Sequence, residues 1–335
     1  MRDVRILCSI STRNRYENYL PMAMASVLNQ TRSPDHFRLY DDNDDPKDLR
    51  QIDAYLQLFK AFDAKGISWD VVYGQKKGQH HNHQAANKAG FAAVWRIDDD
   101  CVAESNVLEK LEAQLVDGVG AVGGIIRMPN MSFIAPPAEA TSMIDDIDKP
   151  NRQWFKFTET EEVDHLHCAY LYRAGIADFD MRLSKKAHRE ETLHTYSIKL
   201  KGYKVLITPC ITWHLKAQAG GIRSDDNIQD YQHDEWIFRQ WLKFKKTGKR
   251  LYVLNNGLGD HYQFLQAIKP EPDSIIACCY PDMMQGHPNL ISIAEAMNMV
   301  NIEGYDVYKW CGDNHWEGTL IEAFKKLYKN IDNTR

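Results

Sequence analysis

The stretch Trp95–Cys101, WRIDDDC, places three consecutive carboxylates directly after an apolar run. Three adjacent charges cannot pack into a hydrophobic core, because each would be desolvated beside like-charged neighbours. If residues 94–97 form a strand, its two-residue period directs Asp98 and Asp100 to one side and Asp99 to the other. Carboxylates at the carboxyl end of a strand favour a site for Mg²⁺ or Mn²⁺ carrying a diphosphate. A solvated acidic turn is the alternative that these residues alone leave open.

The composition is that of a globular protein. The chain has 335 residues, of which 44% are hydrophobic and 11% aromatic, which argues against disorder. A formal net charge of −5 excludes a global basic field for nucleic acid or anionic membranes. The 7 cysteines form no CxxC pair, which predicts reduced thiols in a cytoplasmic protein. We expect no signal peptide and no transmembrane helix, because no run of about eighteen apolar residues occurs.

Strand and helix patterns alternate along the first part of the chain. β-rich runs are separated by amphipathic segments, which predicts an α/β fold with a mainly parallel sheet and right-handed crossovers. Proline and acidic residues predict a long irregular excursion over residues 129–150. The predicted strands are residues 4–10, 37–40, 68–73, 93–97, 120–127 and 205–213, and the predicted helices are residues 20–30, 55–64, 82–91, 106–115 and 193–200.

A basic stretch, residues 243–250, marks the predicted boundary between a first domain, residues 1–245, and a second domain, residues 246–335. The second domain is predicted to be a small βαβαβα unit that serves as a structural or partner-binding module, with a second active site as the alternative. Its glycine turn, NGLGD at residues 256–260, is weak evidence for a ligand by itself. The predicted strands are residues 251–254, 274–279 and 305–310, and the predicted helices are residues 263–268, 290–299 and 320–328.

Other side chains with chemical potential lie on predicted loops and strand ends. His214 follows a predicted strand, and a histidine that shares one sheet edge with carboxylates is a plausible shell for Mn²⁺. Lys76 lies on the polar loop 74–81, which is either plain surface or a loop that contacts phosphate or base. Residues 218–223 contain two glycines and end in Arg223, which predicts a lid that closes over a diphosphate.

A series of separated motifs resembles the family-2 glycosyltransferases of the GT-A fold, and the resemblance covers residues 1 to about 223. It implies a Rossmann-like, mostly parallel mixed sheet with flanking helices, to which the small C-terminal domain is appended. The motifs are STRNR at 11–15, YLPMAMASVLNQT at 19–31, LYDD at 39–42, the helix that contains Asn87, RIDDDC at 96–101, HREET at 188–192, GYKVLITP at 202–209 and WHLK at 213–216.

The resemblance implies roles for residues around a nucleotide-sugar donor. Asp41 or Asp42 is similar to the carboxylate that hydrogen-bonds the nucleotide base, and Thr12 and Arg13 line the same pocket. Lysine and arginine side chains add positive charge near the diphosphate. The donor-binding residues predicted in this way are Thr12, Arg13, Asp41, Asp42, Lys76, Asp98, Asp99 and Arg223.

The resemblance also implies a metal site and a general base. Asp98 and Asp100 are similar to the metal and ribose aspartates of the family, with Asp100 as the predicted direct ligand, and His214 is similar to a histidine that completes the metal shell. Glu191 occupies the position of the second acid in the family's Glu-Asp pair, which is the base. Since glutamate replaces aspartate there, the choice between Glu190 and Glu191 stays open.

These features together predict a cytoplasmic, inverting glycosyltransferase that uses Mn²⁺ or Mg²⁺. We expect transfer from a nucleoside-diphosphate sugar, UDP-type, to the hydroxyl of an acceptor that is a glycan, a small molecule, a protein or a modified DNA base. The alternatives are a phage-type enzyme acting on a hydroxymethylated DNA base, a catalytically inactive GT-A-like binding protein, and a nucleotidyltransferase. The last is disfavoured because STRNR at 11–15 lacks the glycines of a phosphate loop.

Overall fold

The chain divides into two compact units, residues 1–234 and residues 235–335. The domain boundary predicted at residue 245 falls near the end of helix α6, Ile228–Lys246. None of the described helices is long and apolar enough to cross a membrane. The structure, a computed structural model, describes residues 4–127, 138–139, 158–215, 220–221, 227–246, 250–284, 286–297 and 300–333.

The first unit is built on one large mixed sheet, in the order β3-β2-β1-β4-β9-β6-β10-β5, with β7 beside β6 and β8 beside β10. Strands β3, β2, β1 and β4 are parallel, as are β6 and β10, whereas β9 runs antiparallel between β4 and β6. The strands are β1 Ile6–Thr12, β2 His36–Asp41, β3 Ser68–Tyr73, β4 Ala93–Ile97, β5 Cys101–Ala103, β6 Val119–Arg127, β7 Ala138–Glu139, β8 Glu161–Glu162, β9 Ala169–Arg173 and β10 Lys204–His214. The predicted GT-A-like mixed sheet is therefore confirmed.

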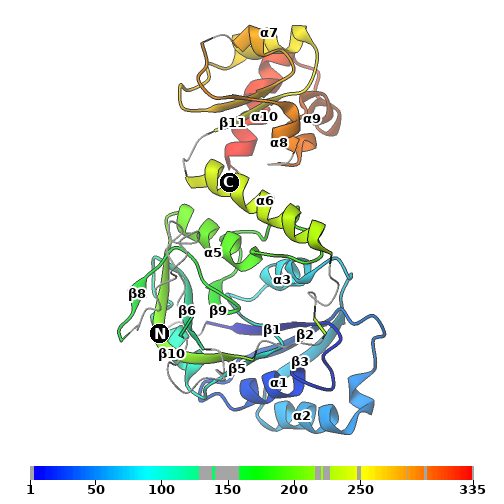
Figure 1. Ribbon diagram of the computed structural model, residues 1–335, viewed down its shortest axis with the longest axis vertical. Helices are drawn as coiled ribbons and strands as arrows, with labels where there is room; N and C mark the ends of the chain where they lie inside the picture. Colours follow the sequence, from blue (N-terminus) through cyan, green and yellow to red (C-terminus); the bar gives the residue numbers. More distant parts are fainter. Residues whose placement is uncertain are drawn as a thin grey trace. The chain divides into compact units, whose positions relative to one another are not determined.

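Helices cover both faces of this sheet, as Figure 1 shows for α1 and α2 on one side and α3 and α5 on the other. Successive residues of β4 pack on opposite faces of the sheet. Trp95 packs with side chains of α1, α2 and α4, and Val94 packs with those of α3 and α5. Burial on both faces explains the nearly continuous apolar strands. The helices are α1 Leu20–Leu28, α2 Asp53–Ala64, α3 Gln79–Asn87, α4 Val107–Gln114 and α5 Glu190–Leu200.

The second unit has a three-stranded parallel sheet in the order β11-β12-β13, so the small α/β unit exists. Its third strand was predicted wrongly. Residues 305–310 do not form a strand, because Asp306 caps the helix that begins at Val307 by accepting the Tyr308 and Lys309 amide hydrogens. The elements are β11 Leu251–Leu254, α7 Leu258–Ala267, β12 Ile275–Cys278, β13 Leu290–Ile291, α8 Ile293–Met297, α9 Val307–Asp313 and α10 Leu320–Asn333.

One further prediction differs from the described elements, and another lies almost entirely outside the described residues. The predicted helix 290–299 begins instead as strand β13 and becomes helical only at Ile293. The predicted excursion 129–150 lies outside the described residues, apart from Ala138 and Glu139 in β7. Side chains of the basic stretch also lie outside them, except that of Arg250.

Candidate active site

The three aspartates of the acidic loop between β4 and β5 have three different sets of partners. Asp98 forms an ion pair with Arg96, on the strand that leads into the loop. Asp99 accepts a hydrogen bond from Thr12 Oγ1 at 2.7 Å and pairs with Arg15. The same Arg15 guanidinium lies 3.1 Å from Asp100. The residues form a turn rather than a continued strand, so the two-residue alternation predicted for them ends at Ile97.

Burial raises the pKa of Asp99 to about 6, although Arg15 and Thr12 act in the opposite direction. Asp99 is 4% exposed, and its carboxylate ties the acidic loop to the end of β1. Such a buried carboxylate is stable only when positive or hydrogen-bonding groups surround it. Asp99 therefore holds the loop against the β1 end in the described conformation.

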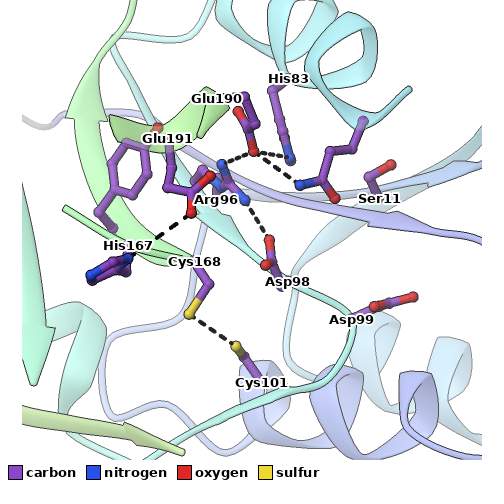
Figure 2. Close-up of polar contacts among 12 residues, drawn as sticks. Ser11, His83, Arg96, Asp98, Asp99, Cys101, His167, Cys168, Glu190 and Glu191 are labelled. Carbon is purple, nitrogen blue, oxygen red and sulfur yellow. Dashed lines mark hydrogen bonds and ion pairs between the residues drawn. The ribbon is translucent and has the colours of Figure 1, made fainter. Parts of the chain in front are cut away.

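Arg96 joins the acidic loop to the start of α5, as Figure 2 shows. Its side chain is fully buried and points to the α3 and α5 face of the sheet, where one nitrogen pairs with Glu190 and another with Asp98. Glu190 also accepts a hydrogen bond from Gln79 Nε2 at 3.1 Å, and His83 Nε2 lies 3.8 Å away. A buried guanidinium requires such paired carboxylates, because its desolvation is otherwise too costly.

Glu191 lies beside Arg96 in Figure 2, and its own side-chain partner there is His167, just before β9. Its Oε1 lies 4.0 Å from His167 Nδ1, and its side chain is 18% exposed, whereas that of Glu190 is 0% exposed. Burial raises the pKa of Glu190 above its ordinary value. Burial would raise the pKa of Glu191 as well, but His167 and Arg96 outweigh it and hold that pKa below its ordinary value. Glu191 is therefore the more exposed member of the pair, and its surroundings favour the carboxylate form.

The loop before α5 has an unusual backbone that a distant carboxylate supports. Ala187 and Arg189 have positive φ angles of 50° and 68°, a region that few non-glycine residues adopt. Asp234 accepts hydrogen bonds from the Ser184 amide at 2.6 Å and the His188 amide at 2.8 Å. This carboxylate is fully buried and fixes the segment that delivers the two glutamates.

A second polar group lies where β1 and β2 end side by side. Asp41 accepts a hydrogen bond from Tyr16, and Asp42 accepts one from the Lys76 amide at 3.2 Å and one from Asn82 Nδ2 at 2.9 Å. Burial raises the pKa of Asp42. Gly74 is required beside it, because a Cβ there would lie 1.7 Å from Asp42 Oδ1.

Two basic residues of the predicted donor site meet at the exposed side of this group. Arg13 Nη2 lies 3.1 Å from Asp44 Oδ1, and Lys76 Nζ donates to the Asp44 carbonyl oxygen at 3.0 Å. Gly221 donates its amide hydrogen to the Arg13 carbonyl oxygen at 2.7 Å. Arg223, predicted to lie over a diphosphate, is outside the described residues.

Asp100 and His214 fit a divalent ion. His214 Nε2 lies 3.4 Å from Asp100 Oδ1, and one ligand atom from each of Asp100, Cys101 and His214 lies within 4.8 Å of the other two. The antiparallel pairing of β5 and β10 sets His214 opposite Cys101, which brings their side chains to one face. Leu215 donates its amide hydrogen to the Asp100 carbonyl oxygen at 2.8 Å and fixes this register. A carboxylate with an imidazole is a donor set that Mn²⁺ accepts.

The model of the family described as "Glycosyl transferase family 2" matches residues 8–176, half of the chain. The chain belongs to glycosyltransferase family 2. The predicted resemblance is confirmed, and with it the prediction of a glycosyltransferase.

Solved structures show the same fold as this family-2 chain. GalNAc-T7, determined with UDP, GalNAc and Mn²⁺, has 14% identity and a TM-score of 0.53 over 90% of this chain, which spans only 57% of that protein. Residues 1–349 of S. aureus TarS, in complex with UDP-GlcNAc, have 12% identity and a TM-score of 0.50 over 99% of this chain and 92% of that one. No curated protein sequence is a match. The GT-A fold is thus shown.

Three residues of this family-2 chain escaped the sequence analysis as site residues. Arg15 contacts two of the aspartates, Arg96 contacts Asp98 and Glu190, and His167 contacts Glu191. The sequence signal for Arg96 was a charged residue inside an otherwise apolar strand, since such a charge needs buried partners.

Proposed function

We propose that the chain is a metal-dependent, inverting glycosyltransferase that moves a sugar from a UDP-type nucleotide sugar to an acceptor hydroxyl. The observation that carries this proposal is the contact of Arg96 with both Asp98 and Glu190. Through it, one buried side chain joins Asp98, proposed for the donor, to Glu190, which directly precedes the proposed base Glu191. Family membership favours sugar transfer over the alternative of nucleotidyl transfer.

Asp100 and His214 are the ligands that we propose for Mn²⁺ or Mg²⁺. When bound, the ion supplies a Lewis acid that neutralises charge on the leaving nucleoside diphosphate. The structure of GalNAc-T7 with UDP and Mn²⁺ supports this choice of ion. Asp98, similar to a metal or ribose aspartate, is ion-paired with Arg96 in the described conformation, so we propose it for the donor's ribose side rather than as the principal ligand.

The ends of β1 and β2 are the proposed nucleotide pocket. Asp41 or Asp42 accepts a hydrogen bond from the base, and Thr12, which Asp99 orients, lies at the same sheet edge. Lys76 and Arg13 supply positive charge beside the pocket, and we keep Arg223 as a proposed ligand of the diphosphate. The complex of the TarS fragment with UDP-GlcNAc supports a UDP-type donor.

Glu191 is the general base of this proposal. A base must reach the acceptor hydroxyl, and Glu191 is 18% exposed whereas Glu190 is 0% exposed. Glu191 removes the proton from the acceptor hydroxyl as the oxygen of that hydroxyl attacks the anomeric carbon, on the side opposite the leaving diphosphate. A single displacement of this kind inverts the configuration at that carbon. Glu190 holds the start of α5 against Arg96 and is a positioning residue.

The test is consumption of nucleotide sugars by the purified protein with Mn²⁺, followed as release of the nucleoside diphosphate. A panel of sugars and of acceptors with free hydroxyls is offered, including hydroxymethylated DNA. We expect one UDP-sugar to be consumed, chelation of the metal to stop turnover, and Asp100→Asn to lower kcat/KM at least about a hundredfold. Asp117→Asn, which changes an exposed carboxylate, is the matched control. If the protein binds none of the nucleotide sugars and consumes none of them, the proposal is wrong.

A further inference from the structure

Two buried thiols lie beside the residues proposed for the metal. Cys101 directly follows Asp100, and its Sγ belongs to the group of three ligand atoms within 4.8 Å of one another. Cys168 directly precedes β9, and its Sγ lies 3.5 Å from that of Cys101 (Figure 2). Cys101 is 0% exposed and Cys168 is 7% exposed. Neither thiol has a role in the proposed transfer.

Backbone hydrogen bonds hold both sulfurs in place. Cys101 is paired with His214 across β5 and β10, so thiol and imidazole share one face. Asp98 donates its amide hydrogen to the Cys168 carbonyl oxygen at 3.1 Å, which anchors Cys168 to the acidic loop. The thiol pair is therefore built into the same loop that carries the proposed metal ligands.

Two separations are close to those between neighbouring ligands of a tetrahedral metal site, and the ligand atoms within 4.8 Å of one another come from Asp100, Cys101 and His214. Metal–sulfur bonds of about 2.3 Å and metal–nitrogen or metal–oxygen bonds of about 2.0–2.1 Å give edges of about 3.8 Å between sulfurs and about 3.3 Å between nitrogen and oxygen. The corresponding separations here are 3.5 Å between the sulfurs of Cys101 and Cys168 and 3.4 Å between His214 Nε2 and Asp100 Oδ1. Both edges are close to their values in a zinc site.

We propose that Asp100, Cys101 and His214 form a binding site for Zn²⁺, with the Cys168 thiol as a neighbour of the Cys101 sulfur. Thiolates are soft ligands that select Zn²⁺ over Mg²⁺ and Mn²⁺, and the Cys101 thiol releases its proton to solvent on coordination. The inference rests on the proposed function in one respect, that Asp100 and His214 are shared with the catalytic ion. Because both ions need Asp100 and His214, bound Zn²⁺ excludes the catalytic ion, and transfer that depends on that ion stops.

The test is metal binding by the full-length protein without any nucleotide. Co²⁺ serves as a spectroscopic substitute for Zn²⁺, and we expect an intense thiolate-to-Co²⁺ charge-transfer band that Zn²⁺ abolishes by competition. Cys101→Ser removes the band and weakens Zn²⁺ binding at least about tenfold, while Mn²⁺ binding is unchanged. Cys168→Ser has the same effect on the band to a smaller degree. Two controls keep the band, Cys210→Ser, a buried thiol of β10, and Cys279→Ser, an exposed thiol.

The outcomes separate this inference from the proposed function. A Co²⁺ complex without a thiolate band, or a band that survives in both Cys101→Ser and Cys168→Ser, overturns the zinc site. Because the readout is binding and not turnover, a chain that consumes no nucleotide sugar refutes the proposed function and still tests the zinc site. In an active enzyme, Zn²⁺ added with excess Mn²⁺ inhibits the wild type, and Cys101→Ser relieves the inhibition at least about tenfold.

Discussion

At the scale of single residues, two adjacent glutamates have opposite surroundings. Glu190 is enclosed by Arg96, Gln79 and His83, whereas Glu191 is partly open and faces His167. The helix rotates successive residues by about a quarter turn, which is enough to direct one carboxylate into the sheet and the other beside it. Local helix geometry thus separates the proposed positioning acid, Glu190, from the proposed catalytic one, Glu191.

Replacing Glu191 by glutamine tests that separation. Glutamine keeps the size of the side chain but cannot accept a proton, so we expect kcat to fall at least about a hundredfold. The affinity for UDP with Mn²⁺, measured by calorimetry, should not change. Glu112→Gln, which alters a carboxylate paired with Arg32, is the control and should leave kcat unchanged. Wild-type turnover in Glu191→Gln would transfer the role of base to another residue.

The pH dependence of transfer should depend on His167. Burial alone would raise the pKa of Glu191, but His167 and Arg96 hold it below its ordinary value. The base acts as the carboxylate, so activity is present above that pKa and is lost as the pH falls through it. His167→Gln removes a lowering interaction, which raises the pKa of Glu191 and moves the acidic limb of the kcat profile to higher pH.

The measurement is kcat against pH at saturating donor for the wild type and His167→Gln. His36→Gln is the matched control, because that histidine pairs with Asp70 at the β2–β3 edge. If the acidic limb of His167→Gln lies at the same pH as that of the wild type, His167 does not act on the pKa of the base.

The sequence indicated individual carboxylates better than the contacts between them. Asp100 and Glu191 were predicted as site residues because Asp100 follows a strand and Glu191 lies at the start of a helix, positions where α/β sheets bind ligands. Their roles stay predictions. The partner of Arg96 could not be predicted, since Glu190 lies 94 positions further along the chain. Only the sheet, which turns Arg96 toward α5, brings these two side chains together.

At the scale of elements, helix α6 supports the loop that precedes α5. Asp234 is on α6, and it accepts hydrogen bonds from the Ser184 amide and hydroxyl and from the His188 amide. Asp234→Ala leaves buried amide groups without an acceptor, which costs about 1–3 kcal/mol. The strained residues Ala187 and Arg189 then relax, and the two glutamates shift.

We expect Asp234→Ala to lower kcat at least about tenfold while UDP binding is retained, because a small misplacement of the base slows the reaction strongly. Asp63→Ala, which removes a carboxylate that accepts from Trp69 at the end of α2, is the control. Steady-state kinetics and calorimetric titration with UDP distinguish the two effects. A loss of UDP affinity with unchanged kcat would contradict the prediction.

The elements of the first unit were easier to predict than those of the second. Strands buried on both faces, such as β1 and β4, give continuous apolar runs that sequence patterns indicate clearly. Residues 305–310, YDVYKW, are also rich in aromatic and β-branched side chains, yet the Asp306 side chain caps a helix there. Capping is a local contact that competes with a short β-like pattern, and it decided the outcome.

At the scale of the whole molecule, every described residue proposed for the donor or the base lies in the first unit. Binding of UDP with Mn²⁺ should therefore stabilise the first unit by about 2.7 kcal/mol at a hundredfold excess over Kd. Hydrogen exchange read by mass spectrometry should show added protection in β1, β2 and the acidic loop. Protection of β11 and β12 should not change. The Asp100→Asn substitution should abolish the added protection in the first unit that depends on Mn²⁺.

An equal gain of protection in both units would contradict this assignment of the donor site to the first unit. The same result would follow from an additional nucleotide site in the second unit, at the NGLGD stretch of residues 256–260, which leads into α7 and forms its first turn. Exchange in the absence of Mn²⁺ distinguishes these cases, because a site in the second unit would not depend on Asp100.

The position of β9 has a consequence for folding. This strand lies between β4 and β6, although it follows both in the chain, so the sheet closes only after residues 169–173 have been added. Contacts between such distant segments form late, because the chain must first close a long loop. Glu190 is on α5, which follows β9 in the chain, so the Arg96–Glu190 contact should form after β9 has joined the sheet. Nascent or partly folded chains should therefore bind no donor. Nucleotide binding should measure the fraction of chains that are completely folded.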